Sequence, residues 1–153
     1  MRLKEEISSI NIYTNCIEDT IIRQRVQQVL EWNIKKSTYH KWLFYILNIV
    51  IIILNAFIPI LNQIGYYDLL ITIFASTTAV ITSIITLINF KDVWYRYRSS
   101  AEAIKSECIK LRGQVGDYSL DDRERTFIIN VESIVSNERN LWQQSRFNDE
   151  TNS

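Results

Sequence analysis

The chain has 153 residues, of which 17 are basic and 17 acidic, so its formal net charge at pH 7 is zero. A neutral chain has no overall electrostatic attraction to nucleic acid, and we expect no nucleic-acid partner. One Pro and three Gly leave little room for strands and tight turns, so an almost wholly helical chain is predicted.

Residues 1–41 are predicted to form the N-terminal cytosolic helices. Residues 3–14, with Ile7, Ile10 and Tyr13, suit either a short helix or an arm. A second helix is expected from Glu18 towards Trp32, leading into the membrane, with an interruption near Ser37 and Thr38. Its apolar stripe consists of Ile21, Ile22, Val26, Val29 and Leu30. No apolar core follows the first residues, so we expect no cleavable signal peptide.

Residues 42–61 and 69–90 are two apolar stretches that contain no charged residue. Each is long enough to cross a bilayer, because roughly 20 helical residues cover a hydrocarbon core of about 30 Å. The alternative is a pair of buried helices in a soluble bundle, but a bundle helix normally keeps a charged face. The sequence therefore predicts an all-α membrane protein, a two-span helical hairpin over residues 42–90 with long cytosolic helical extensions.

Basic residues crowd the two open ends of this hairpin, whereas the link at residues 62–68 has no Lys or Arg. They are Lys35, Lys36 and Lys41 before the first span, and Lys91, Arg96 and Arg98 after the second. The cytosolic flanks of membrane spans carry such an excess of positive charge. Both termini are therefore expected in the cytosol.

Residues 91–147 are predicted to form an antiparallel helical stalk. Apolar residues after the second span recur at steps of three and four, as in the seam of a coiled coil. Since no helix breaker intervenes, we expect the second span to run straight into the stalk, as far as residues 113–116. The seam residues are Trp94, Tyr97, Ala101, Ile104, Cys108, Leu111 and Val115.

A second stalk helix is expected after a turn at residues 116–118. Ser119 with Asp122 resembles a capping box, which satisfies the free N–H groups at a helix start. The tail at residues 148–153 is polar and expected to be disordered. The apolar stripe of this helix should pack on the first stalk helix and consists of Phe127, Ile128, Val131, Ile134, Val135, Leu141 and Trp142.

Both predicted spans carry polar residues. The first has Asn48 and Asn55, whose amides are costly in hydrocarbon unless hydrogen-bonded. Two interpretations of this polarity remain open, which are close packing of helices and the lining of a water-filled pore. Either predicts a homo-oligomer, because two spans cannot bury their own polar residues. The second span has a narrow arc of small residues, namely Thr72, Ser76, Ala79, Ser83 and Thr86.

No catalytic or cofactor-binding pattern is present in the sequence. His40 is the one histidine, and no Cys pair has metal-ligand spacing, so we expect no metal, no cofactor and no enzymatic activity. Cys16 and Cys108 are expected to be buried free thiols. Surface ion pairing is the expected role of four glutamates in the stalk, Glu102, Glu107, Glu132 and Glu138.

The sequence WYRYRSSAEAIKSE at residues 94–107 carries a Trp, Arg, Ala-Glu, aliphatic-Lys and Glu pattern, formed by Trp94, Arg98, Ala101, Glu102, Ile104, Lys105 and Glu107. This pattern resembles the signature of the SLATT superfamily, the bacterial SMODS- and SLOG-associating two-transmembrane effector domains. The sequence IPIL at residues 58–61 is similar to the family's proline near the end of its first span. The family's C-terminal helix is resembled by Phe127, Val131, Glu132, Ile134, Glu138 and Trp142. The resemblance covers residues 18–145.

The resemblance implies an effector of a bacterial conflict or antiphage system in the cytoplasmic (inner) membrane. In the role proposed for the family, members oligomerise and open a pore or disrupt the membrane when a nucleotide-signal system is triggered. We expect no fused sensor domain, so that a nucleotide signal or a separate sensor protein would act on the cytosolic helices.

Two functional hypotheses follow. In the first, a homo-oligomer forms a pore that Thr72, Ser76, Ser83 and Thr86 line, with Asn48 and Asn55, and that Lys41, Lys91 and Arg96 ring at its cytosolic mouth. In the second, the protein is a non-conducting membrane scaffold whose stalk recruits a cytosolic partner.

Overall fold

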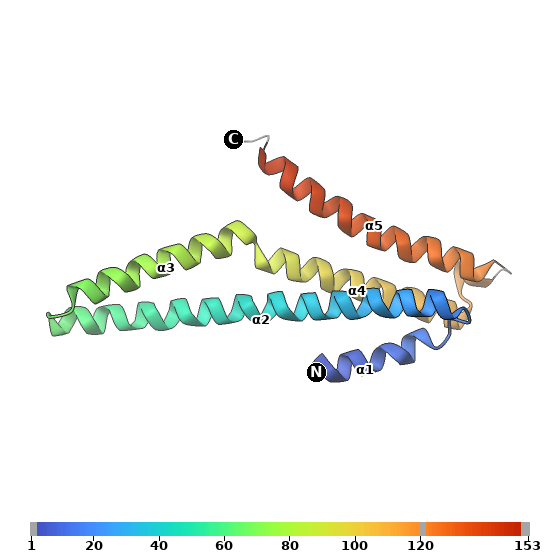
Figure 1. The fold of residues 1–153 in the computed structure, drawn as a ribbon, viewed down its shortest axis with the longest axis horizontal. Coiled ribbons are helices and arrows are strands. Elements are labelled where there is room, and N and C mark those ends of the chain that lie inside the picture. Colours follow the sequence, from blue (N-terminus) through green and yellow to red (C-terminus); the bar gives the residue numbers. More distant parts are fainter. Residues whose placement is uncertain (1–2, 120–121, 151–153) are drawn as a thin grey trace. The chain divides into compact units, whose positions relative to one another are not determined.

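The computed structural model describes residues 3–119 and 122–150, with no account of the side chains at 138, 139 and 141–150. All regular structure in these residues is helical, which confirms the expectation from composition. The elements are α1 (Leu3–Thr14), α2 (Thr20–Ile64), α3 (Asp68–Ile88), α4 (Phe90–Gly113), the 3₁₀ helix η1 (Gly116–Ser119) and α5 (Arg123–Glu150) (Figure 1).

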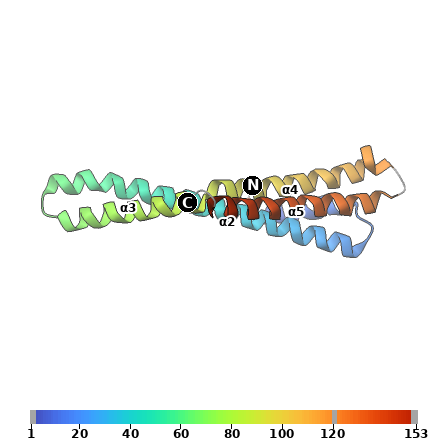
Figure 2. The ribbon, with the colours of Figure 1, turned by 90° about the horizontal axis from the view of Figure 1, so that it is seen from above.

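The chain divides into two compact units. The first, here called the bundle, comprises Met1–Ser37 and Tyr95–Ser153, and the second, here called the hairpin, comprises Thr38–Trp94. The segments treated above as separate, 1–41 and 91–147, thus contribute to one unit. In the hairpin, α3 begins beside the end of α2 and runs back antiparallel to it (Figures 1 and 2).

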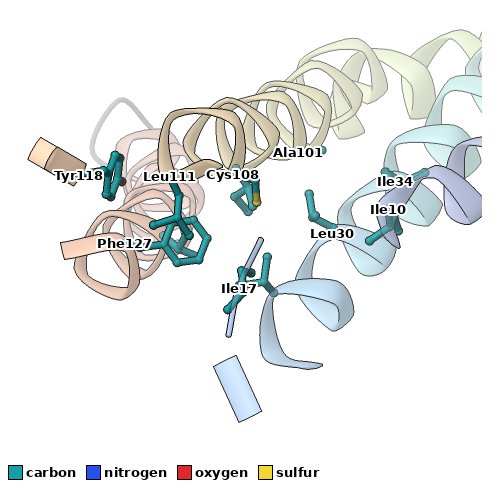
Figure 3. Packing of buried hydrophobic residues seen from close by; sticks show 12 residues of the cluster. Ile10, Ile17, Leu30, Ile34, Ala101, Cys108, Leu111, Tyr118 and Phe127 are labelled. Carbon is teal, nitrogen blue, oxygen red and sulfur yellow. The ribbon is translucent and has the colours of Figure 1, made fainter. Parts of the chain in front are cut away.

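The hydrophobic core lies in the bundle (Figure 3). Phe127 of α5 packs beside Leu111 of α4, and the ring of Tyr118 in η1 lies 6.4 Å from that of Phe127. Every helix of the bundle contributes, because each presents one apolar stripe to the others. The buried cluster consists of Ile10, Ile17, Val26, Leu30, Ile34, Ala101, Ile104, Cys108, Leu111, Tyr118, Phe127 and Val131.

Residues 3–14 form a docked helix and not an arm. Ile10 and Thr14 are buried, and the Thr14 hydroxyl donates to the Ile10 carbonyl at 3.2 Å while accepting from Gln27 Nε2 at 2.9 Å. Asp19 then begins α2, since its carboxylate accepts from the backbone N–H groups of Ile21 and Ile22 at 2.7 and 3.2 Å. α1 is therefore a fixed part of the bundle.

The interruption expected near Ser37 and Thr38 is wrong, because α2 continues unbroken from Thr20 to Ile64. Ser37 is buried, and its hydroxyl donates to the Ile34 carbonyl at 3.0 Å. A hydroxyl satisfied by its own helix does not compete for the backbone N–H groups, so it does not end the helix.

The expected continuous passage from the second span into the stalk is also wrong. Asn89 adopts the left-handed conformation (φ 47°, ψ 52°) and separates α3 from α4. Its backbone N–H donates to the Ile85 carbonyl at 3.1 Å, and its side chain donates to the Asp92 carboxylate. Asn tolerates this conformation better than most other non-glycine residues, so it can end α3 although the sequence has no Gly or Pro at this point.

The end of the stalk hairpin differs from the expectation in three details. Val115 is 63% exposed, because α4 ends at Gly113 and the seam ends at Leu111. The capping box is not formed, since the Ser119 hydroxyl donates to the Gly116 carbonyl at 2.9 Å inside η1. α5 extends to Glu150, so residues 148–150 are helical, as the lack of Gly or Pro after Gly116 allows.

Replacing a core residue of α4 should destabilise the bundle. Ile104→Ala removes a fully buried side chain and is expected to lower the free energy of unfolding by about 2–5 kcal/mol. The control is Ile109→Ala on the same helix, which is 59% exposed and should change that free energy by no more than about 0.5 kcal/mol. Urea unfolding in detergent micelles, followed by circular dichroism, measures both. Equal effects would contradict the core assignment.

Candidate functional site

The hairpin uses only one face of each long helix for its internal contact. The half-buried residues of this seam are Phe44, Leu47, Ile51, Leu54, Ile58 and Leu61 of α2, and Ile71, Phe74, Thr78, Ile81 and Ile85 of α3. Both helices are long and apolar enough to cross a membrane, and none of the most apolar window of either is buried inside the chain. The remaining faces are rich in exposed Ile, Leu and Val, as a surface that meets lipid would be.

The arc of small residues predicted on the second span lies away from this seam. Thr72, Ser76, Ser83 and Thr86 are exposed, and the centre of their arc is roughly 140° around α3 from the centre of the seam. Ala75 and Thr82 extend the arc. We call this surface the small-residue face and define it as Thr72, Ala75, Ser76, Ala79, Thr82, Ser83 and Thr86.

The hydroxyl groups of the small-residue face donate hydrogen bonds to their own helix. Each Ser or Thr bonds to the carbonyl four residues earlier, at distances between 2.8 and 3.0 Å. Their lone pairs point outward and stay available as acceptors. Thr78, which sequence reasoning did not single out, bonds in the same way at 2.8 Å but lies in the seam. The hydroxyls can therefore face lipid, another helix or water.

The two asparagines of α2 are in different environments. Asn48 is half-buried and donates to the Phe44 carbonyl at 2.7 Å. Asn55 is exposed, and within the described residues its side chain makes no hydrogen bond. It lies six residues before the end of the predicted span at residue 61, roughly 9 Å along the helix. If that span lies in hydrocarbon, the Asn55 amide needs a partner from outside the chain.

The basic residues predicted at the pore mouth are divided between the two units. Lys41 and Lys91 belong to the hairpin and are exposed, with the Lys41 ammonium 5.4 Å from the centroid of the Trp94 ring. Arg96 belongs to the bundle and is half-buried. His40 packs its ring against Phe90, with centroids 6.1 Å apart, as a residue in a helix contact does.

The family-like motif of α4 forms a charged cluster with α1. Arg98 Nη1 and Lys105 Nζ both donate to Glu6 Oε1, at 2.6 and 3.1 Å. Glu102 Oε1 accepts from Arg98 Nη2 at 2.8 Å and from Lys105 Nζ at 3.1 Å. Sequence reasoning missed Glu6, although it lies one helical turn before the buried Ile10 and so on the docked face of α1. We call these four residues the Glu6 cluster.

Burial alone would raise the pKa of Glu6, but hydrogen bonds and charges from Lys105 and Arg98 outweigh it and hold the pKa below its ordinary value of 4.5. The carboxylate is therefore ionised near neutral pH. Because Lys105 is buried as well, the pair is a structural tie between α1 and α4 and not a surface ion pair.

Glu107 lies in a second network and not on the surface as expected. Its carboxylate accepts from the Tyr118 hydroxyl, from Lys110 at 2.7 Å and from Asn130 at 3.4 Å. Burial and the bond to Glu107 raise the pKa of Tyr118 to about 12. The network joins α4, η1 and α5, so this motif residue fixes the turn of the stalk.

The remaining motif residues divide into three groups. Ala101 is fully buried in the core, and Trp94 lies against Lys41. Glu132 pairs with Arg25 at 3.4 Å with both side chains half-exposed, as surface pairs are. Glu138 and Trp142, like Leu141, lie outside the side chains that the structure describes.

Both cysteines are free thiols in the bundle. Burial raises the pKa of Cys108 to about 12, and burial also raises that of Cys16, which is half-buried. The Cys16 thiol donates to the Tyr13 carbonyl at 3.1 Å and approaches the Cys108 carbonyl at 3.5 Å. Two thiols that stay protonated are poor nucleophiles, so they act here as core residues.

A family model described as "Protein of unknown function (DUF4231)" matches residues 28–126, more than half of the chain. The matched range includes α2 from residue 28 onward and all of α3 and α4, but it leaves out α1. No curated protein and no solved structure matches the chain significantly.

The Glu6 cluster should make the stability of the bundle depend on pH. A Glu whose pKa is lowered by folding contributes stability above its unfolded pKa, and this contribution is lost as the pH falls through the folded value. The difference in unfolding free energy between the wild type and Glu6→Gln should therefore be full above about pH 5 and shrink as the pH falls below 4.5.

Urea unfolding of both proteins across this pH range is the measurement. Glu107, whose pKa is also lowered, is present in both and cancels in the difference. A difference that stays constant down to pH 3 would show that Glu6 does not carry the effect.

Proposed function

The chain belongs to the DUF4231 family, and we propose that it is a homo-oligomeric two-span protein of the bacterial inner membrane that forms a gated pore. Both termini lie in the cytosol in this proposal, as the basic flanks of the hairpin favour. The pattern from Trp94 to Glu107, which resembles the SLATT superfamily, supports the further role of an antiphage effector that compromises the membrane on activation.

The exposed amide of Asn55 carries the proposal of assembly. In a helix that is apolar and exposed on its other faces, one unmet amide at hydrocarbon depth costs several kcal/mol by transfer scales. A second copy of the chain can supply the missing donor and acceptor, and so can water in a pore. Because α3 of the same chain does not supply them, the Asn55 amide supports our proposal that chains associate.

The small-residue face supports conduction through the assembly. It is exposed and carries five hydroxyl oxygens with free lone pairs, and it has no large side chain that would fill a lumen. Asn48 and Asn55 add amides from α2. Lys41 and Lys91 of the hairpin would stand at the cytosolic mouth, where a ring of positive charge disfavours cations.

One observation favours the alternative, a non-conducting scaffold that recruits a cytosolic partner. The Ser and Thr hydroxyls already donate to their own helix, so they do not need water. Small residues also let helices approach closely, and a face of this kind can serve contact only. The two functions therefore differ in what happens when the face is made bulky.

Conduction is tested by planar-bilayer recording of purified protein with Ser76→Leu/Ser83→Leu. If the face lines a pore, the variant should keep the subunit number of the wild type and lose its conductance. If the face serves contact only, the variant should lose assembly. Ile73→Leu/Val80→Leu, on an exposed apolar face of α3, is the matched control and should leave both unchanged. Silence of the wild type at every voltage and ligand tried would count against a pore.

Assembly is tested by Asn55→Leu. Loss of one interhelical amide contact, at about 0.6–2 kcal/mol, should weaken association between chains by roughly 3- to 30-fold. Ile52→Leu, exposed on the same helix, is the control. Förster transfer between labelled subunits in micelles of varied detergent content gives the association constant. Association that is unchanged or stronger in Asn55→Leu would exclude this residue from the interface.

A further inference from the structure

Two cations of α4 converge on one oxygen atom that belongs to α1. Arg98 Nη1 lies 2.6 Å and Lys105 Nζ 3.1 Å from Glu6 Oε1. Proteins hold carboxylates and phosphates by this arrangement, in which charged donors lie at hydrogen-bond distance from an oxygen atom. Glu6 thus occupies this position as a ligand would, although it is part of the same chain.

The position is built into the bundle and is not a chance meeting of surface chains. The side chain of Lys105 is only 9% exposed, and its ammonium also lies 5.8 Å from the centroid of the Tyr13 ring. Arg98 and Glu102 are 41% and 51% exposed, so the cluster opens to solvent on their side. Glu102 accepts from both cations, so each cation has a second carboxylate partner besides Glu6.

The charges of the cluster balance only while α1 is docked. Arg98 and Lys105 supply two positive charges, and Glu6 and Glu102 supply two negative charges. Removal of the Glu6 carboxylate leaves one positive charge in excess. Two neighbouring cations that share one counterion attract a further anion, so the vacated position favours an anion from solution.

α1 is a short helix whose stability depends on its contacts with the rest of the bundle. It has 12 residues, and a helix of that length is marginal in water without its tertiary contacts. Of these residues only Glu6, Ile10 and Thr14 are buried. The family match at residues 28–126 covers Arg98, Glu102 and Lys105 but not α1.

We propose that Arg98 and Lys105 form a binding site for a compact oxyanion, a carboxylate or phosphate group, which Glu6 fills from within the chain and which opens when α1 leaves. Anion binding and α1 docking then compete for one site. By linkage, a ligand that binds only the open form stabilises that form and releases α1. The site thereby gives the bundle a means to sense an anionic group.

The test uses the full chain in detergent micelles and titrates it with inorganic phosphate, with acetate, and with chloride at matched ionic strength. Glu6→Ala vacates the position. Calorimetry should show saturable binding of phosphate or acetate at least about tenfold tighter in Glu6→Ala than in the wild type, because the internal competitor is gone. If phosphate binds tighter than acetate, the ligand is a phosphate group; if acetate binds tighter, it is a carboxylate group.

The control is Glu6→Ala/Lys105→Met, which removes one of the two cations and should lose the binding. Should Glu6→Ala not fold, Glu6→Gln keeps the side-chain volume and removes the charge, and the same titration applies. In the wild type, saturating phosphate should raise hydrogen exchange in residues 3–14 and leave that of residues 101–111 unchanged.

Any of three results would overturn the site. Phosphate and acetate could bind equally to the wild type and to both Glu6 variants, or their binding could survive the loss of Lys105. Chloride could also reproduce the effect. None of these measurements involves conduction or subunit number. Their failure therefore leaves the proposed pore untouched, and failure of the pore leaves the site untouched.

Discussion

The structure depends on a surplus of apolar surface that the chain cannot cover by itself. α2 and α3 pack through one seam, and their other faces present exposed Ile, Leu and Val. In water this exposed apolar surface would cost about 25 cal/mol for each Å². A hydrocarbon solvent removes that cost and adds another, because each polar group at that depth must find a partner. The back-bonded hydroxyls of α3 meet this second demand, whereas the Asn55 amide does not.

α4 organises the bundle by using two kinds of contact on one helix. Its apolar stripe, with Ala101, Ile104, Cys108 and Leu111, enters the core. Its charged residues hold the neighbouring elements, since the pair of Arg98 and Lys105 holds α1, and Glu107 holds η1 and α5. The residues that resemble the SLATT signature thus have structural roles at these junctions. The motif is therefore evidence for the fold, and evidence for a function only as far as the fold implies that function.

The long periodic features were predictable from sequence, and the local breaks were not. Charge-free stretches and apolar residues spaced three and four apart predicted the helices and most of the bundle core. A buried helix face needs a whole stripe of apolar residues, and such a stripe is visible in the sequence. The break at Asn89 depends on one backbone conformation that many Asn residues never adopt, so no pattern announces it. α2 continues through Ser37, whose hydroxyl donates to a carbonyl of its own helix, and the residue type alone does not predict that bond. Glu6 was missed because its partners lie more than 90 positions away along the chain.

The left-handed residue at Asn89 resets the helical phase of the chain. In an unbroken helix, the direction of each side chain is fixed by counting about 100° per residue. That count stops at Asn89, so the small-residue face of α3 and the apolar stripe of α4 are not in one register. Side-chain directions in α3 and in α4 must therefore be assigned separately, each by counting from a residue within its own helix.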